Sequence, residues 1–127
     1  MLDTARRTLA RAERVLSENA SDSYALITGV SALAKLGEAE RTKQWAVRVK
    51  AVDPDDPSID YNIACAMALL GETDAALDTL DACLPRVDPV TFSVWVEQDT
   101  DLDALRDFPR FQRLVRELDA RAAAARA

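Results

Sequence analysis

Histidine is absent from this chain of 127 residues, which removes the side chain that most often serves as general base and as metal ligand. A glycine-rich phosphate loop, a Gly-x-Ser-x-Gly nucleophile elbow and a CxxC pair are missing as well. The sequence therefore predicts no catalytic residues, no metal ligands and no cofactor. It favours a protein that is not itself an enzyme, although a catalytic domain could precede it in a longer chain.

Cysteine is scarce, with two residues, and both lie inside apolar runs of helical spacing. A thiol in such a run usually behaves as a small buried hydrophobe, and we expect this of Cys65 and Cys83. Two cysteines are too few for the disulfide framework of a secreted domain. A single disulfide or a redox pair remains the alternative.

Long hydrophobic runs are also lacking. The longest, residues 63–70, is far short of the roughly 20 residues that a membrane-spanning helix needs. Arginines recur through the start of the chain, from Arg6 to Arg14, where a signal peptide would have an uninterrupted apolar core. These absences predict a cytoplasmic protein without membrane insertion, and the net charge of −6 disfavours nucleic acid as a partner.

Only three glycines and five prolines interrupt the chain, and 49% of its residues are hydrophobic, so the pattern predicts a single all-α domain. The periodicity indicates helices over residues 4–18, 24–36, 38–52 and 108–118, and a helical hairpin over 61–84 that bends at Gly71.

Three further segments are less regular. Residues 91–97 alternate like a strand, but a lone strand has nothing to pair with, so we predict a short helix there. Residues 99–103 are expected to form a loop or a turn of helix. Their alternate acids resemble a calcium loop, but the glycine and the distal acid of such a loop are missing, so caps and turns explain these acids better. We expect residues 120–127 to fray.

A repeat underlies the helices. Gly37 and Gly71 each stand between two amphipathic segments, and both are preceded by leucine and followed by glutamate. Their spacing sets a period of about 34 residues, and a helix-turn-helix unit with this period resembles the tetratricopeptide repeat (TPR). The proline that closes such a repeat is matched by Pro54 and, one position late, by Pro89. The aromatic residue usual early in the first helix is replaced by Leu26 and Asp60.

The resemblance implies antiparallel helical hairpins stacked as a short right-handed superhelix with a C-terminal capping helix. The single domain then divides into a half repeat (1–22), two repeats (23–56 and 57–90), and a C-terminal cap with its tail (91–127). The segment from Asp101 to Leu114 resembles the one that closes TPR arrays in bacterial signalling proteins, including class III adenylate and guanylate cyclases.

In TPR arrays the first helices of successive repeats line a concave groove that binds a partner. Carried over by position, the groove residues here are Tyr24, Ile27, Ser31 and Lys35 from one repeat and Tyr61, Cys65 and Leu69 from the next. Asn62 matches a groove asparagine common in the family, but the basic residues of a carboxylate clamp are absent. One hypothesis is that the helix over 108–118 fills this groove, because residues 63–70 are apolar on every face and need cover on more than one side.

The resemblance thus implies a non-catalytic protein–protein interaction or scaffold module, the C-terminal part of a larger bacterial signalling protein. It would bind a protein, a peptide or a second copy of itself. The alternative is a regulatory domain that senses a peptide or small ligand and controls an attached adenylate or guanylate cyclase.

Charge is uneven along the chain. Residues 23–54 carry five basic and three acidic side chains, whereas residues 55–90 carry one basic and eight acidic ones. Solvated helix faces account for such a bias. Steering of a basic segment of a partner is the functional alternative.

Overall fold

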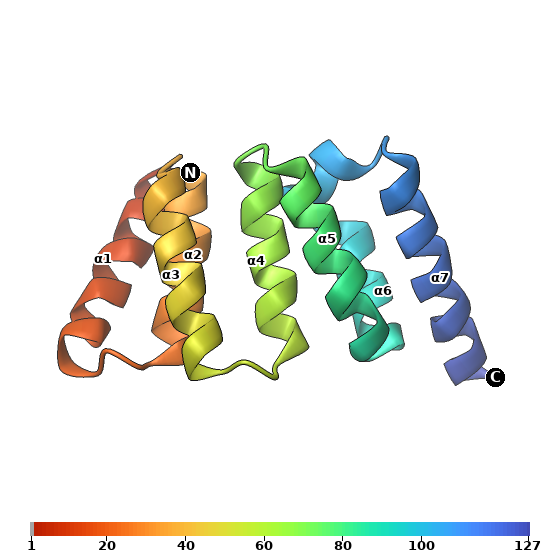
Figure 1. The fold of residues 1–127 in the computed structure, drawn as a ribbon, viewed down its shortest axis with the longest axis horizontal. Coiled ribbons are helices and arrows are strands. Elements are labelled where there is room, and N and C mark those ends of the chain that lie inside the picture. The colour runs from red at the N-terminus through yellow and green to blue at the C-terminus, as the bar shows by residue number, and fades with distance from the viewer. Residues whose placement is uncertain (1) are drawn as a thin grey trace.

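The computed structural model describes residues 2–127, so Met1, the first residue of the predicted half repeat, lies outside it. Every regular element in this range is helical, which confirms the all-α prediction (Figure 1). The α-helices are α1 (Leu2–Glu18), α2 (Ser23–Lys35), α3 (Ala39–Val52), α4 (Pro57–Leu69), α5 (Thr73–Cys83), α6 (Pro89–Gln98) and α7 (Pro109–Arg126). Two 3₁₀ turns, η1 (Leu84–Arg86) and η2 (Thr100–Leu105), complete the chain. The ambiguous residues 91–97 are helical, within α6.

Aspartate begins the first helix of each hairpin. The carboxylates of Asp22, Asp56 and Asp88 accept hydrogen bonds from backbone N–H groups in the first turns of α2, α4 and α6, at 2.9, 2.9 and 3.1 Å. Each bond satisfies an N–H that has no partner within its helix. Proline also occupies the first position of α4 and of α6, where its fixed φ suits a helix start.

Glycine forms the sharp turns inside the first two hairpins. Gly37 and Gly71 have φ values of +76° and +77°, a left-handed conformation that side chains disfavour. After them, the N–H groups of Glu38 and Glu72 donate back to the carbonyls of Leu33 and Met67, which closes the preceding helix. The second helix of each hairpin can therefore begin almost at once.

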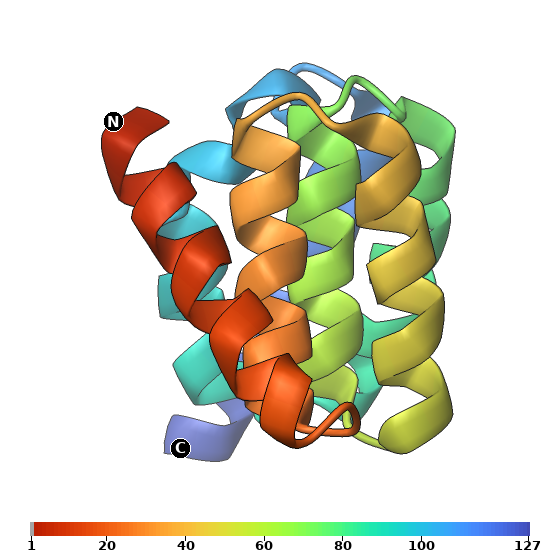
Figure 2. The ribbon, with the colours of Figure 1, turned by 90° about the vertical axis from the view of Figure 1, so that its left-hand side faces the viewer.

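The helices stack along the long axis of the molecule from α1 to α7, with α3 in front of α2 and α6 behind α5 in the view of Figure 1. The first helix of each hairpin packs against the second, and α2 also packs against α1 and α4. Figure 2 shows α2 and α4 next to each other, with α3 on one side of them and α1 on the other. One continuous core runs through the stack, and its fully buried side chains include Leu26, Leu33, Val49, Leu80, Leu102, Leu105 and Leu118.

The end of the chain is better ordered than the sequence suggests. We expected residues 120–127 to fray, but α7 continues to Arg126. Ala122 is buried, and the guanidinium of Arg121 donates to the carbonyls of Leu84 and Val87 at 2.8 and 3.2 Å. These carbonyls lie in and beside η1, so the tail is held by a part of the chain distant in sequence.

Ion pairs connect neighbouring hairpins and use much of the acidic charge of residues 55–90. Lys43 of α3 pairs at 3.0 Å with Glu72, the N-cap residue of α5, and Lys50 of α3 pairs at 2.7 Å with Asp60 of α4. Arg110 of α7 pairs with Asp78 of α5 at 2.8 Å. No helix in the described part of the chain is both long and apolar enough to cross a bilayer.

Candidate functional site

The predicted groove residues fall into an open half and a covered half. On α2, Tyr24 is 77% exposed, Lys35 is exposed, and Ile27 and Ser31 are half-buried. On α4, Tyr61 and Cys65 are buried, with 2% and 4% of their surface exposed, whereas Leu69 at the end of the helix is 39% exposed. The α2 side of the predicted groove and Leu69 at the end of α4 are therefore available to a partner in this structure, whereas Tyr61 and Cys65 are not.

The cover on α4 comes from α6 and η2. Phe92 lies edge-on to the ring of Tyr61 with centroids 5.3 Å apart, and Trp95 lies 6.3 Å from Tyr61. The hypothesis that the helix over 108–118 covers this face names the wrong element, because α7 packs against α5 and α6.

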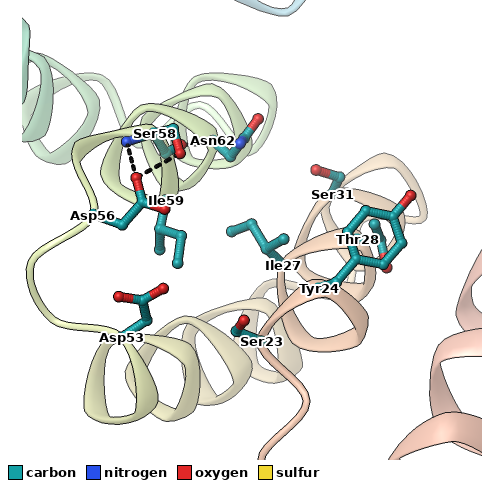
Figure 3. Close-up of a pocket in the computed structure, with 10 residues that line it drawn as sticks. All are labelled: Ser23, Tyr24, Ile27, Thr28, Ser31, Asp53, Asp56, Ser58, Ile59 and Asn62. Carbon is teal, nitrogen blue, oxygen red and sulfur yellow. Dashed lines mark hydrogen bonds between the residues drawn. The ribbon is translucent and has the colours of Figure 1, made fainter. Parts of the chain in front are cut away.

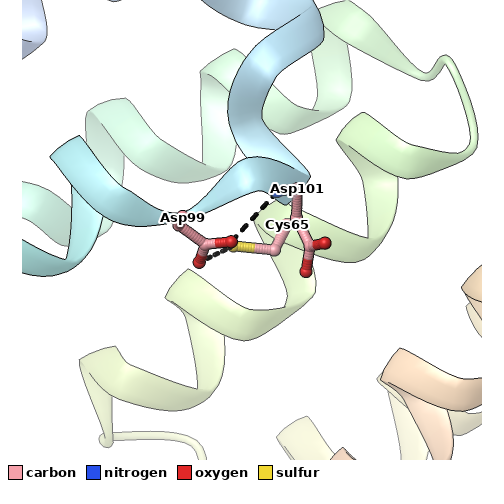
Figure 4. A group of neighbouring side chains, drawn as sticks. All are labelled: Cys65, Asp99 and Asp101. Carbon is pink, nitrogen blue, oxygen red and sulfur yellow. Dashed lines mark hydrogen bonds between the residues drawn. The ribbon is translucent and has the colours of Figure 1, made fainter.

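Asp99 joins this cover to α4. Its Oδ2 accepts a hydrogen bond from the Tyr61 hydroxyl at 2.9 Å. The same oxygen accepts one from the Cys65 thiol at 3.4 Å, and Oδ1 accepts one from the backbone N–H of Asp101 at 3.1 Å (Figure 4). Burial, together with the nearby Asp99 carboxylate, raises the pKa of Tyr61 and of Cys65, so both groups remain protonated donors. The carboxylate thereby connects two helices and the start of η2.

Cys65, Asp99 and Asp101 are also the described side chains whose spacing would suit a metal ion, with ligand atoms within 4.8 Å of one another. Their bonding favours a structural role instead. Both oxygens of Asp99 already accept hydrogen bonds, and the thiol would have to lose its proton against a raised pKa. Asp103, the third alternate acid, pairs with Arg106 at 2.9 Å.

An open cleft of about 350 Å³ lies between α2 and α4 (Figure 3). Ile27 and Ile59 face each other across it, and Tyr24 lies at its outer rim. Asp53 and Asp56 border it where the α3–α4 connection passes. The remaining lining residues are Ser23, Thr28, Ser31, Ser58 and Asn62.

Position in the repeat predicted a place in the groove for Tyr24, Ile27 and Ser31, but not for Asp53 or Asp56. Asp56 is the N-cap of α4, and the Ser58 hydroxyl that donates to it lowers its pKa. The repeat nevertheless offers a way to predict that these two aspartates border the cleft. If α2 and α4 lie side by side, the connection that leads into α4 must pass one end of the cleft between them.

A second cleft, of about 330 Å³, lies on the other side of α2, against α1. Thr28 and Ser31 border both clefts, so the exposed stripe of α2 forms a ridge between them. Hydroxyl groups of Thr4 and Thr8 line the α1 wall, and Lys35 lies at its end. The open surface is therefore centred on α2.

Both cysteines are buried free thiols, so the disulfide alternative does not describe this structure. Burial, followed by the nearby Asp60 carboxylate, raises the pKa of Cys83 to about 12. Neither thiol is therefore ionised near neutral pH, the state that a nucleophile or a redox centre needs.

Comparison of the chain with family models, with curated proteins and with solved structures finds no match.

Proposed function

We propose that this chain is a non-catalytic protein-interaction module of the TPR type, which binds a protein or peptide along α2 and the adjoining cleft. One observation carries the proposal: Tyr24, a large aromatic side chain, is 77% exposed at the rim of an open cleft that also contains Ile27 and Ile59. Tyrosine is enriched at protein interfaces, where its ring supplies contact area at little cost in conformational entropy.

The helix boundaries support the repeat on which this proposal rests. The interval between the capping residues Asp22 and Asp56 equals the interval between the turn residues Gly37 and Gly71. Asp88 follows Asp56 after a slightly shorter interval and begins α6 in the same way. This spacing favours α6 and α7 as a third, modified hairpin that ends the stack, rather than a cap of a different kind.

The absence of catalysis is part of the proposal. The chain has no histidine, and its thiols and Tyr61 are held protonated by burial. We further infer that the module works in the cytoplasm, as the C-terminal part of a larger bacterial signalling protein, where it would present its helical surface to a partner or to a second copy.

A regulatory ligand-sensing domain attached to a cyclase is the second candidate. The volume of the α2–α4 cleft, about 350 Å³, favours it, because small-molecule sites begin at roughly this size. A small ligand would raise the midpoint of thermal unfolding with the logarithm of its concentration once that exceeds Kd, whereas self-association would make the midpoint depend on protein concentration.

Selection from a phage library of short random peptides on the full chain tests the proposal. The selected peptides should bind at least about tenfold more weakly to Tyr24→Ala, because an aromatic anchor carries much of the energy of an interface. The matched control is Val47→Ala, which shortens an exposed side chain on α3. Failure to select any peptide, or equal binding by both variants, would contradict the proposal.

Light scattering over a wide range of protein concentrations tests self-association, with Leu69→Asp as the variant. Leu69 lies at the end of the predicted groove and is partly exposed, so aspartate there should disrupt a dimer formed through this face without unfolding the chain. A wild-type chain that remains monomeric at every concentration would exclude the second copy as partner.

A further inference from the structure

Asp53, like the neighbouring Asp55 and Asp56, forms no ion pair within residues 2–127, whereas several acidic residues farther along the second hairpin do. Asp60 pairs with Lys50 and Arg86, and Glu72 pairs with Lys43. Asp53 itself is half-buried at the end of the α2–α4 cleft. A carboxylate in this position has lost part of its hydration without gaining a cation.

The surroundings of this carboxylate suit one kind of side chain. Asp56 lines the cleft beside it, and none of the residues that line the cleft is basic. Ile27 and Ile59 offer apolar surface on the two walls of the cleft, and Asp53 lies at the end where the α3–α4 connection passes, while the Asp56 carboxylate accepts hydrogen bonds from Ser58 (Figure 3). Lysine and arginine combine an apolar stem with a cationic end, and they bury the stem while the charge reaches a polar site.

We infer that the cleft binds a lysine or arginine side chain of the partner segment, with its stem against Ile27 and Ile59 and its charge at Asp53. This inference rests on the proposed function, because it specifies the chemistry of the partner. The net charge of −6 would steer a basic segment toward the chain. An acidic segment would meet two carboxylates and no cation in this cleft, which excludes it as the occupant.

The peptides selected on the full chain test the inference. We expect them to be enriched in lysine or arginine next to apolar residues, and to bind Asp53→Asn about fivefold more weakly than the wild type, as measured by fluorescence anisotropy. The control is Asp74→Asn, which removes the same charge from an exposed position on α5 and should leave the affinity unchanged. Binding of the wild type should also weaken as NaCl rises from about 0.1 M to about 1 M.

The outcomes separate this inference from the proposed function. Peptides without a preference for basic residues that still lose binding on Tyr24→Ala would leave the proposed function in place and overturn the inference. Basic peptides that bind Asp53→Asn and the wild type equally, or that weaken equally on Asp74→Asn, would also overturn it. If no peptide can be selected, both fail. The midpoint of thermal unfolding of Asp53→Asn is expected to match that of the wild type, which would show that any loss of peptide binding comes from the cleft and not from unfolding.

Discussion

The two tyrosines of this chain lie in opposite environments, one buried and one exposed. The Tyr61 hydroxyl is buried and donates to Asp99 at 2.9 Å, whereas Tyr24 is mostly exposed. Tyr61→Phe should lower the free energy of unfolding by about 1–2 kcal/mol, because it removes a hydrogen bond to a partly buried carboxylate. Urea unfolding followed by circular dichroism measures the change. Tyr24→Phe is the matched control and should change stability little. Equal effects of the two substitutions would mean that the Tyr61–Asp99 bond does not hold the cover on α4.

Gly29 has no Cβ, and the ring of Trp45 occupies the space that a Cβ would need. A Cβ at this position would collide with the Cζ3 and Cε3 atoms of the Trp45 ring. The ring cannot easily move, because it is buried and the guanidinium groups of Arg41 and Arg48 lie 5.8 and 5.6 Å from its centroid.

Gly29→Ala should therefore destabilise the protein by about 1–3 kcal/mol through overpacking. In an open helical position the same change would stabilise the protein by about 1 kcal/mol. The sign of the change in unfolding free energy, measured by urea unfolding, therefore tells whether Trp45 packs against this position. A Trp45→Leu background provides the control, because removing the ring should abolish the penalty. A stabilising effect of Gly29→Ala in the wild-type background would refute the close packing of α2 on α3.

At the scale of the helix, the lowered pKa of Asp56 predicts that the stability of the fold depends on pH. The Ser58 hydroxyl and nearby backbone N–H groups lower its pKa below the ordinary value of 3.8. A lowered pKa means that the carboxylate stabilises the folded state above pH 3.8, and that this contribution is lost as the pH falls through the folded pKa. Asp56→Ala should cost about 1 kcal/mol at neutral pH, whereas Asp56→Asn should retain most of the cap.

Urea unfolding of the wild type and of Asp56→Asn at neutral pH and below pH 3.8 measures this dependence. The wild type should lose more stability on acidification than Asp56→Asn does. Other acids titrate equally in both proteins, including Asp101, whose pKa is raised by burial and by Asp99. Parallel pH profiles would show that the ionised form of Asp56 adds nothing to the cap.

Most helix boundaries could be predicted because their signals are local. Gly37 and Gly71 end helices through their own conformation, and an aspartate or a proline begins the following hairpin. The tail could not be predicted in this way. Its order comes from Arg121, whose acceptors at Leu84 and Val87 are distant in the sequence.

At the scale of the molecule, the repeat in the sequence predicted which residues share a face but not which of them are covered. Position in the repeat placed Tyr24 and Tyr61 on one face, but their exposure depends on where α6 and η2 pack. That packing uses the long-range bond between Tyr61 and Asp99, which no local pattern predicts. For the same reason the local pattern marks Asp53 only as a helix end, since it is the approach of α2 to α4 that makes this residue a wall of the cleft.

The two ends of the stack should contribute unequally to stability. The buried residues of α1 are Ala5, Leu9 and Ala12. In contrast, α6, η2 and α7 bury Phe92, Val96, Leu102, Leu105, Phe111, Leu114, Leu118 and Ala122, and they cover Tyr61 and Cys65. In stacked repeats each unit is stabilised mainly by its neighbours, so removing a well-packed terminal unit exposes the face of the next one.

Truncation tests this difference. A chain of residues 22–127 should still unfold cooperatively, at a lower midpoint, because it loses three buried side chains, two of them alanines. A chain of residues 1–88 should lose cooperative unfolding, because its exposed face on α4 and α5 would include Tyr61 and Cys65. Thermal unfolding followed by circular dichroism distinguishes the two, and the urea m-value reports the surface that each chain still buries. If residues 1–88 unfold at the midpoint of the full chain, the C-terminal hairpin does not stabilise the rest of the chain. The face of α4 that it covers could then be exposed to a partner at little cost in free energy.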